Sequence, residues 1–163
     1  MFETATQLWR TADKSTRLQA AEAFWAEDRP DHAQATALIA QKLNLRPVTA
    51  KRLPPERKAA YLAQFDSLSE AMCAQLLTAF YLSHRQAMLS TFLDALSIKN
   101  DHGMFEGESV APPAVEALTP AIRQVVEKFG KNEVERYLSL LYVQDSVFWS
   151  GLKEAVEAAG VAG

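Results

Sequence analysis

Apolar positions recur with helical spacing along nearly the whole chain. They stand three or four residues apart in residues 2–12, 18–25 and 35–43, and again after residue 118. This spacing predicts amphipathic α-helices, and no run alternates apolar and polar residues with the period of a strand. We therefore expect an all-α fold without a significant sheet. Its roughly eight to ten short helices would form a compact multi-helical domain or stacked helical hairpins.

Two segments near the middle of the chain are apolar over a wide arc. They are residues 68–82 and residues 84–97. A helix that is apolar over much of its circumference is buried on several sides. We therefore expect these two segments to be deeply buried helices with shorter helices packed around them.

The chain is predicted to be one domain, residues 1–163, because its length is near that of a single domain. Glycine, proline and asparagine gather in residues 98–113, which predicts a long internal loop. Thr119 and Pro120 have the residue types of an N-cap and a first helical position, so a helix is expected to begin there. Residues 160–163 are expected to form a flexible tail.

Composition narrows the class of protein. Hydrophobic residues make up 48% of the 163 residues and charged residues 23%, which is typical of a folded globular protein. The single cysteine, Cys73, excludes an internal disulfide, and its apolar surroundings in the sequence indicate packing rather than chemistry. No apolar stretch approaches the roughly 20 residues that cross a bilayer, so a cytoplasmic protein is expected.

Positive charge is concentrated in residues 42–58, although the net charge of the chain is −3. Within this segment, residues 36–53 resemble the helix-turn-helix of bacterial transcription regulators. The resemblance implies DNA contacts from a set that comprises Arg46, Thr49, Lys51 and Arg52. Asn44 stands at the turn position, where asparagine tolerates left-handed backbone geometry. Pro54 and Pro55, however, would end the second helix early.

A second group of polar residues suggests a ligand site. Its members lie at the end of the first central helix and in the long loop, and they are Tyr81, His84, Arg85, Asp101 and His102. Histidines and carboxylates can bind ligands or transfer protons, and long loops in compact domains are often functional. No metal-binding motif occurs, so neither a metal nor another cofactor is predicted.

These observations leave three functional hypotheses. No catalytic motif is present, so a non-catalytic module that binds a protein partner or itself is the first. A DNA-binding regulator that uses residues 36–53 is the second. A small-molecule or metal-dependent protein with a site near His84 and the loop of residues 98–113 is the third.

Overall fold

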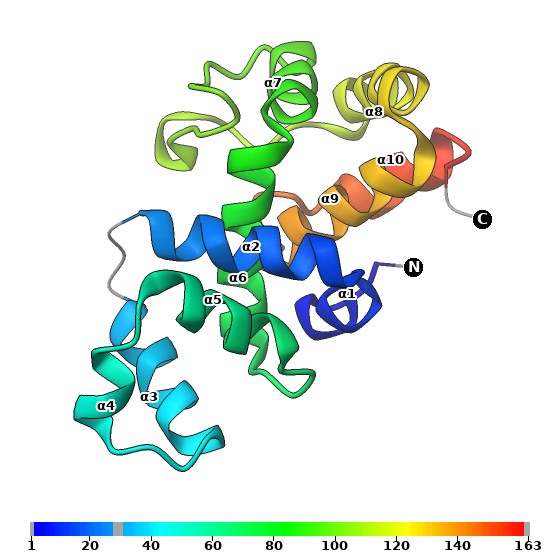
Figure 1. Ribbon diagram of the computed structural model, residues 1–163. Coiled ribbons are helices and arrows are strands. Elements are labelled where there is room, and N and C mark those ends of the chain that lie inside the picture. Colours follow the sequence, from blue (N-terminus) through cyan, green and yellow to red (C-terminus); the bar gives the residue numbers. More distant parts are fainter. Residues whose placement is uncertain (1, 28–30, 162–163) are drawn as a thin grey trace. The chain divides into compact units, whose positions relative to one another are not determined.

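The computed structural model describes residues 2–27 and 31–161, and within them the fold is all-α, as predicted. Ten α-helices and one 3-10 helix occur in this described part, together with one isolated β-bridge between Asp101 and Met104. Figure 1 shows the helices in chain order. No helix of the described part is both long enough and apolar enough to cross a membrane.

The chain divides into two compact units, each packed mainly within itself. We call Thr6–Phe80 the N-terminal unit and Met1–Ala5 together with Tyr81–Gly163 the C-terminal unit. Helix α6, Glu70–His84, runs without a break through the boundary between them.

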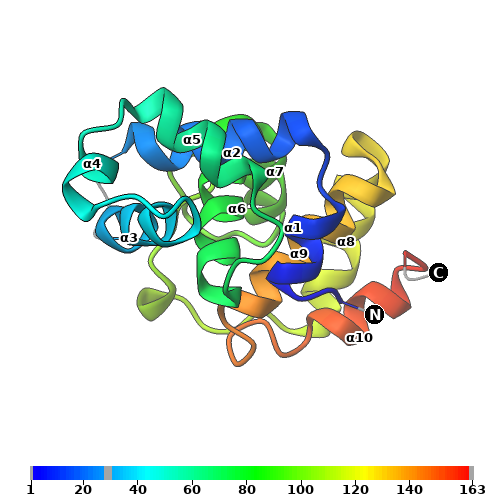
Figure 2. The same ribbon diagram turned by 60° about the horizontal axis from the view of Figure 1, so that its bottom comes forward.

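The N-terminal unit contains the helices that precede α6 and the first part of α6. They are α1 (Ala5–Thr11), α2 (Lys14–Ala26), α3 (His32–Lys42), α4 (Pro47–Lys51) and α5 (Pro55–Gln64). Helix α2 packs along α5, and α3 contacts both α4 and α5 (Figures 1 and 2). Buried Trp9, Phe24 and Leu62 form part of its core. The indole Nε1 of Trp9 donates to the Phe65 carbonyl at 2.8 Å, which satisfies this buried polar group.

The C-terminal unit contains α7 (Gln86–Ala95), α8 (Val115–Phe129), α9 (Lys131–Gln144) and α10 (Leu152–Ala158), with the 3-10 helix η1 (Gly107–Ser109) between α7 and α8. Helix α8 contacts α7, α9 and α10. An aromatic cluster lies in the core, where the fully buried Phe92 ring is 6.0 Å from Tyr137 and 5.9 Å from Trp149.

The two central segments are buried as expected. In α6 the side chains from Met72 to Tyr81 include seven buried residues, which are Met72, Cys73, Leu76, Leu77, Ala79, Phe80 and Tyr81. In α7 the buried residues are Met88, Leu89, Phe92 and Leu93. The wide apolar arcs in the sequence therefore correspond to extensive burial.

Helix α8 begins at Val115, four residues before the predicted start at Thr119 and Pro120. Pro120 lies inside the helix, on its exposed side, where the carbonyl that loses its amide partner can be hydrated. The Thr119 hydroxyl donates to the Val115 carbonyl at 2.9 Å instead of capping the helix. The apolar positions Leu118 and Ile122 fall on both sides of the proline, and their burial maintains the helix.

Residues 160 and 161 are held more firmly than the predicted flexible tail. Val161 is buried, and its amide donates to the Val156 carbonyl at 3.2 Å. The Gly160 amide donates to the Glu157 carbonyl at 3.0 Å, so both residues close the C-terminus of α10. Residues 162–163 of the predicted tail lie outside the described residues.

Asp13 caps α2, and its loss is expected to destabilise the protein measurably. Its carboxylate accepts a hydrogen bond from the Thr16 amide at 2.7 Å. The Asp13→Ala variant should lose about 1 kcal/mol of unfolding free energy, measured by urea denaturation followed by circular dichroism. Asp31 is the matched control, because it precedes α3 without a side-chain capping bond. Equal losses for Asp13→Ala and Asp31→Ala would contradict the capping role.

Candidate functional site

The segment that resembles a helix-turn-helix folds as two helices with a tight turn, but the second helix is very short. After α3 ends, Asn44 adopts the left-handed conformation (φ 53°), as its residue type predicts. The Leu45 amide donates to the Ala40 carbonyl at 2.8 Å and closes the turn. Helix α4 has five residues, and α5 begins at Pro55 directly afterwards. The early end of α4 at Lys51 confirms the predicted effect of Pro54 and Pro55.

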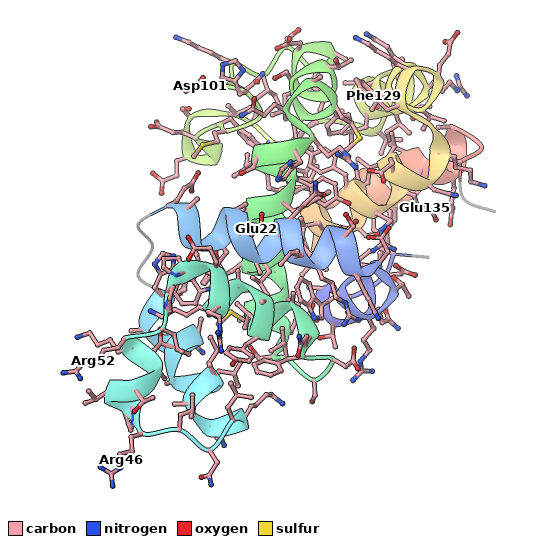
Figure 3. All side chains as sticks on the ribbon, viewed as in Figure 1. Glu22, Arg46, Arg52, Asp101, Phe129 and Glu135 are labelled. Atoms are coloured by element: carbon pink, nitrogen blue, oxygen red, sulfur yellow. The ribbon has the colours of Figure 1, made fainter. Side chains whose placement is uncertain are left out.

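We call residues 46–52 the α4 tip. The tip carries the exposed apolar side chain of Val48 and three basic side chains. Ala50 is buried and anchors the tip, whereas Val48 has 59% of its surface exposed. Arg46, Lys51 and Arg52 are exposed, and none of them has an ion-pair partner within the described part of the chain. Figure 3 shows the Arg46 and Arg52 side chains extending away from the ribbon. Thr49 is also exposed.

The other basic residues of the segment lie against aromatic rings. The Lys42 ammonium is 5.4 Å from the Phe65 ring centroid, and the Lys58 ammonium is 5.1 Å from that of Trp25. The Arg57 guanidinium is 5.9 Å from the Tyr61 ring and donates to its hydroxyl at 3.3 Å. These cation–π contacts attach the three side chains to their own unit. Within residues 42–58, the cations without such a ring contact are therefore those of the α4 tip.

The long loop of residues 98–113 is ordered by a tight hairpin turn. Asp101 and Met104 exchange backbone hydrogen bonds of 2.8 and 3.0 Å around His102 (φ 51°) and Gly103 (φ 98°). Two central residues with positive φ are the signature of a type I′ turn. The Asn100 side chain accepts from the Gly103 amide and donates to the Ile98 carbonyl, which fixes the turn.

Phe105 attaches this loop to the C-terminal unit. Its ring lies 5.7 Å from that of Phe148 and 6.1 Å from that of Trp149. Ile98, at the start of the loop, is buried. The neighbouring Met104 has 61% of its surface exposed. The loop is thus fixed at its start and near its middle, and it presents an apolar side chain to solvent.

A hollow of about 770 Å³ opens within this loop. The residues that line it are Ser97, Lys99, Asn100, Asp101, Met104, Phe105, Glu106, Ser109, Val110 and Ala111. We call it the loop hollow. Its lining combines apolar side chains with two carboxylates and one lysine.

Asp101 is the one residue of the predicted ligand set that lines the loop hollow. His102 lies beside Asp101, with Nε2 at 3.7 Å from Oδ1, and both side chains are exposed. His84 is exposed at the end of α6. Arg85 donates to Glu133 of α9 at 3.2 Å and to the His84 carbonyl at 2.9 Å.

Tyr81 is buried. Burial raises the pKa of its hydroxyl to about 12, the Glu133 charge adds to this, and Arg136 and Arg85 oppose it. The phenol is therefore neutral at physiological pH. Burial likewise raises the pKa of the Cys73 thiol to about 11, with a contribution from the Glu70 charge. Cys73 is thus a protonated core side chain without the thiolate that nucleophilic chemistry needs.

A second hollow, of about 340 Å³, is lined by Glu3, Asn132, Glu135, Arg136 and Ser139. The residues that line this hollow form hydrogen bonds and an ion pair with one another. Ser139 is buried, accepts from the Glu3 amide and donates to the Glu135 carbonyl. The Arg136 guanidinium lies 3.9 Å from the Glu3 carboxylate. Within the residues that the structure describes, no group of three or more His, Cys, Asp or Glu side chains could hold a metal ion.

Sequence reasoning missed the exposed apolar residues Val48 and Met104. The exposure of Val48 could have been predicted, because Val48 does not lie on the helical face that contains Ala50 and Leu53.

Comparison of the chain with protein-family models, with curated proteins and with solved structures found no match.

Proposed function

We propose that this protein is a non-catalytic interaction module whose α4 tip binds an acidic segment of a protein partner. The observation that carries the proposal is the exposed Val48 among three cations without ion-pair partners in the described residues. Many protein interfaces combine an apolar centre with a polar rim whose charges complement those of the partner. The charge steers the partner and fixes its orientation, and the apolar contact contributes affinity.

The length of α4 favours a protein partner over duplex DNA. Five helical residues rise about 7.5 Å, and the prolines that follow prevent extension. A recognition helix in the major groove needs three or four side chains that reach base edges. Here Ala50 is buried and Lys42 lies on Phe65, so fewer side chains of the resembling segment are available. The net charge of −3 also opposes a general affinity for nucleic acid.

The proposal predicts that a glutamate-rich peptide with a single central leucine binds the full-length chain. Affinity is measured by fluorescence anisotropy of the fluorescein-labelled peptide. The double variant Arg46→Glu/Arg52→Glu should weaken binding about tenfold or more, because it places like charges opposite each other. Binding should also weaken as salt is added.

The control reverses the same number of charges elsewhere. Lys14 and Lys131 are exposed first residues of α2 and α9, where glutamate suits the helix dipole. Lys14→Glu/Lys131→Glu should therefore bind the peptide nearly as well as the unaltered chain. Equal weakening by both double variants would reject a specific tip. Tighter binding of a labelled duplex DNA, lost with Arg46→Glu/Arg52→Glu, would show a nucleic-acid site instead.

A further inference from the structure

We infer that the acidic partner is a second copy of this chain, and that the α4 tip of one copy binds the loop hollow of another. This inference rests on the proposed function and identifies the partner of the same tip. Both surfaces belong to the described residues. The tip is basic, the hollow is mainly acidic, and each carries an exposed apolar side chain.

The loop hollow offers carboxylates beside an exposed apolar group. Asp101 and Glu106 line it, and the Asp101 side chain is 90% exposed. Figure 3 shows Asp101 at the edge of its unit. Met104, with 61% of its surface exposed, lies next to these carboxylates in the lining. Lys99 contributes one opposing charge, and Glu108 of η1 adds a third carboxylate to the loop.

The α4 tip carries the inverse arrangement. Arg46 precedes Val48 by two residues, Lys51 and Arg52 follow it by three and four, and residues 46–52 contain no carboxylate. Apposition would bring Val48 against Met104 and bring guanidinium groups to Asp101 and Glu106. Arginine–carboxylate pairs can form two parallel hydrogen bonds, which adds orientation to the attraction. The volume of about 770 Å³ lies within the range of sites that enclose whole side chains or small ligands.

Contacts within each unit fix the part of each surface that carries Asp101 and Met104 or Val48. The type I′ turn, the Asn100 side chain and the Phe105 ring hold the hollow in place. At the tip, the Leu45–Ala40 hydrogen bond and buried Ala50 hold α4. Pre-organised surfaces lose less conformational entropy on binding, so a modest contact can be sufficient.

The tip and the hollow are different surfaces, so their contact is heterologous, that is, head to tail. A heterologous contact leaves one unused tip and one unused hollow in every pair. The unaltered chain should therefore form species that grow with concentration, unless a ring closes. A symmetric dimer, in contrast, would use both of its contact surfaces and would not grow beyond two copies.

Sedimentation velocity on the full chain tests this inference. The weight-average sedimentation coefficient should rise with protein concentration at low salt and fall when salt is raised to about 1 M, where screening acts over about 3 Å. Two variants each disable one surface: Arg46→Glu/Arg52→Glu at the tip, and Asp101→Asn/Glu106→Gln at the hollow. Each alone should shift self-association to concentrations about tenfold higher or more.

Mixing the two variants gives the decisive measurement. The tip variant retains an intact hollow, and the hollow variant retains an intact tip, so one productive contact is possible between them. We expect a heterodimer that does not grow further. The Lys14→Glu/Lys131→Glu control should assemble like the unaltered chain.

Three results would overturn the inference. They are a sedimentation coefficient independent of concentration, self-association of both surface variants at the same concentrations as the unaltered chain, and a mixture that stays monomeric while the unaltered chain assembles. If the unaltered chain is monomeric but its tip still binds the acidic peptide, this inference fails and the proposed function stands. If peptide binding also persists in Arg46→Glu/Arg52→Glu, both fail.

Discussion

Replacement of Phe92 by alanine is expected to lower the free energy of unfolding by about 3–5 kcal/mol. The Phe92 side chain is fully buried in α7, and its ring contacts the rings of Tyr137 and Trp149. Truncation removes buried apolar surface, breaks both aromatic contacts and leaves a cavity between α7 and α9. Urea denaturation of the full chain, followed by circular dichroism, measures the loss.

The control for this variant is Val147→Ala. Val147 is 80% exposed, so its truncation should change stability by no more than about 0.5 kcal/mol. A Phe92→Ala loss as small as that of Val147→Ala would mean that the aromatic cluster does not carry the core of the C-terminal unit.

The Gly103→Ala variant should also destabilise the protein strongly. A Cβ atom at Gly103 would lie 2.6 Å from Leu89 Cβ and 2.7 Å from Leu89 Cδ2, and φ is 98°. Overpacking costs about 1–3 kcal/mol, and a non-glycine residue with this backbone conformation costs about 1–3 kcal/mol more. The total expected loss of unfolding free energy, measured by urea denaturation, is therefore about 2–6 kcal/mol.

Gly160→Ala separates the two causes. Gly160 also has a positive φ, of 73°, in the turn that closes α10, but a Cβ atom there would meet no atom within 4 Å. This variant should show the backbone cost alone, so it should be distinctly more stable than Gly103→Ala. Equal losses would show that Leu89 moves aside without cost and that the loop is not fixed on α7.

Local sequence signals predicted most of the secondary structure. Apolar periodicity predicted the helices, and Pro54 and Pro55 predicted the early end of α4 because proline acts on its immediate neighbours. The predicted start of α8 at Thr119 and Pro120 was wrong because it, too, depended on local signals alone. Thr119 and Pro120 form a strong local signal, but burial of Leu118 and Ile122 on one face of α8 outweighs it.

The candidate site was harder to predict, because it depends on contacts between distant residues. Lys42 and Lys58 belong to a basic run in the sequence, yet each lies on an aromatic ring of another element. Arg85 pairs with Glu133, 48 positions away, and Asp101 instead lines the loop hollow. Charge patterning identified the region of the tip, but only tertiary structure shows which cations remain available.

The hydrogen bond between the Glu3 amide and Ser139 Oγ has a consequence for biosynthesis. Its partners are 136 positions apart, and the ring contact of Phe2 with Tyr142 has a comparable separation. Ribosomes add about 5–20 residues per second, so residues 2–5 wait several seconds or more for α9 to emerge. During that time the N-terminal unit can acquire its own structure, whereas the C-terminal unit is completed only after translation has passed α9. Such distant closure slows folding, because loop entropy is lost before the contact forms.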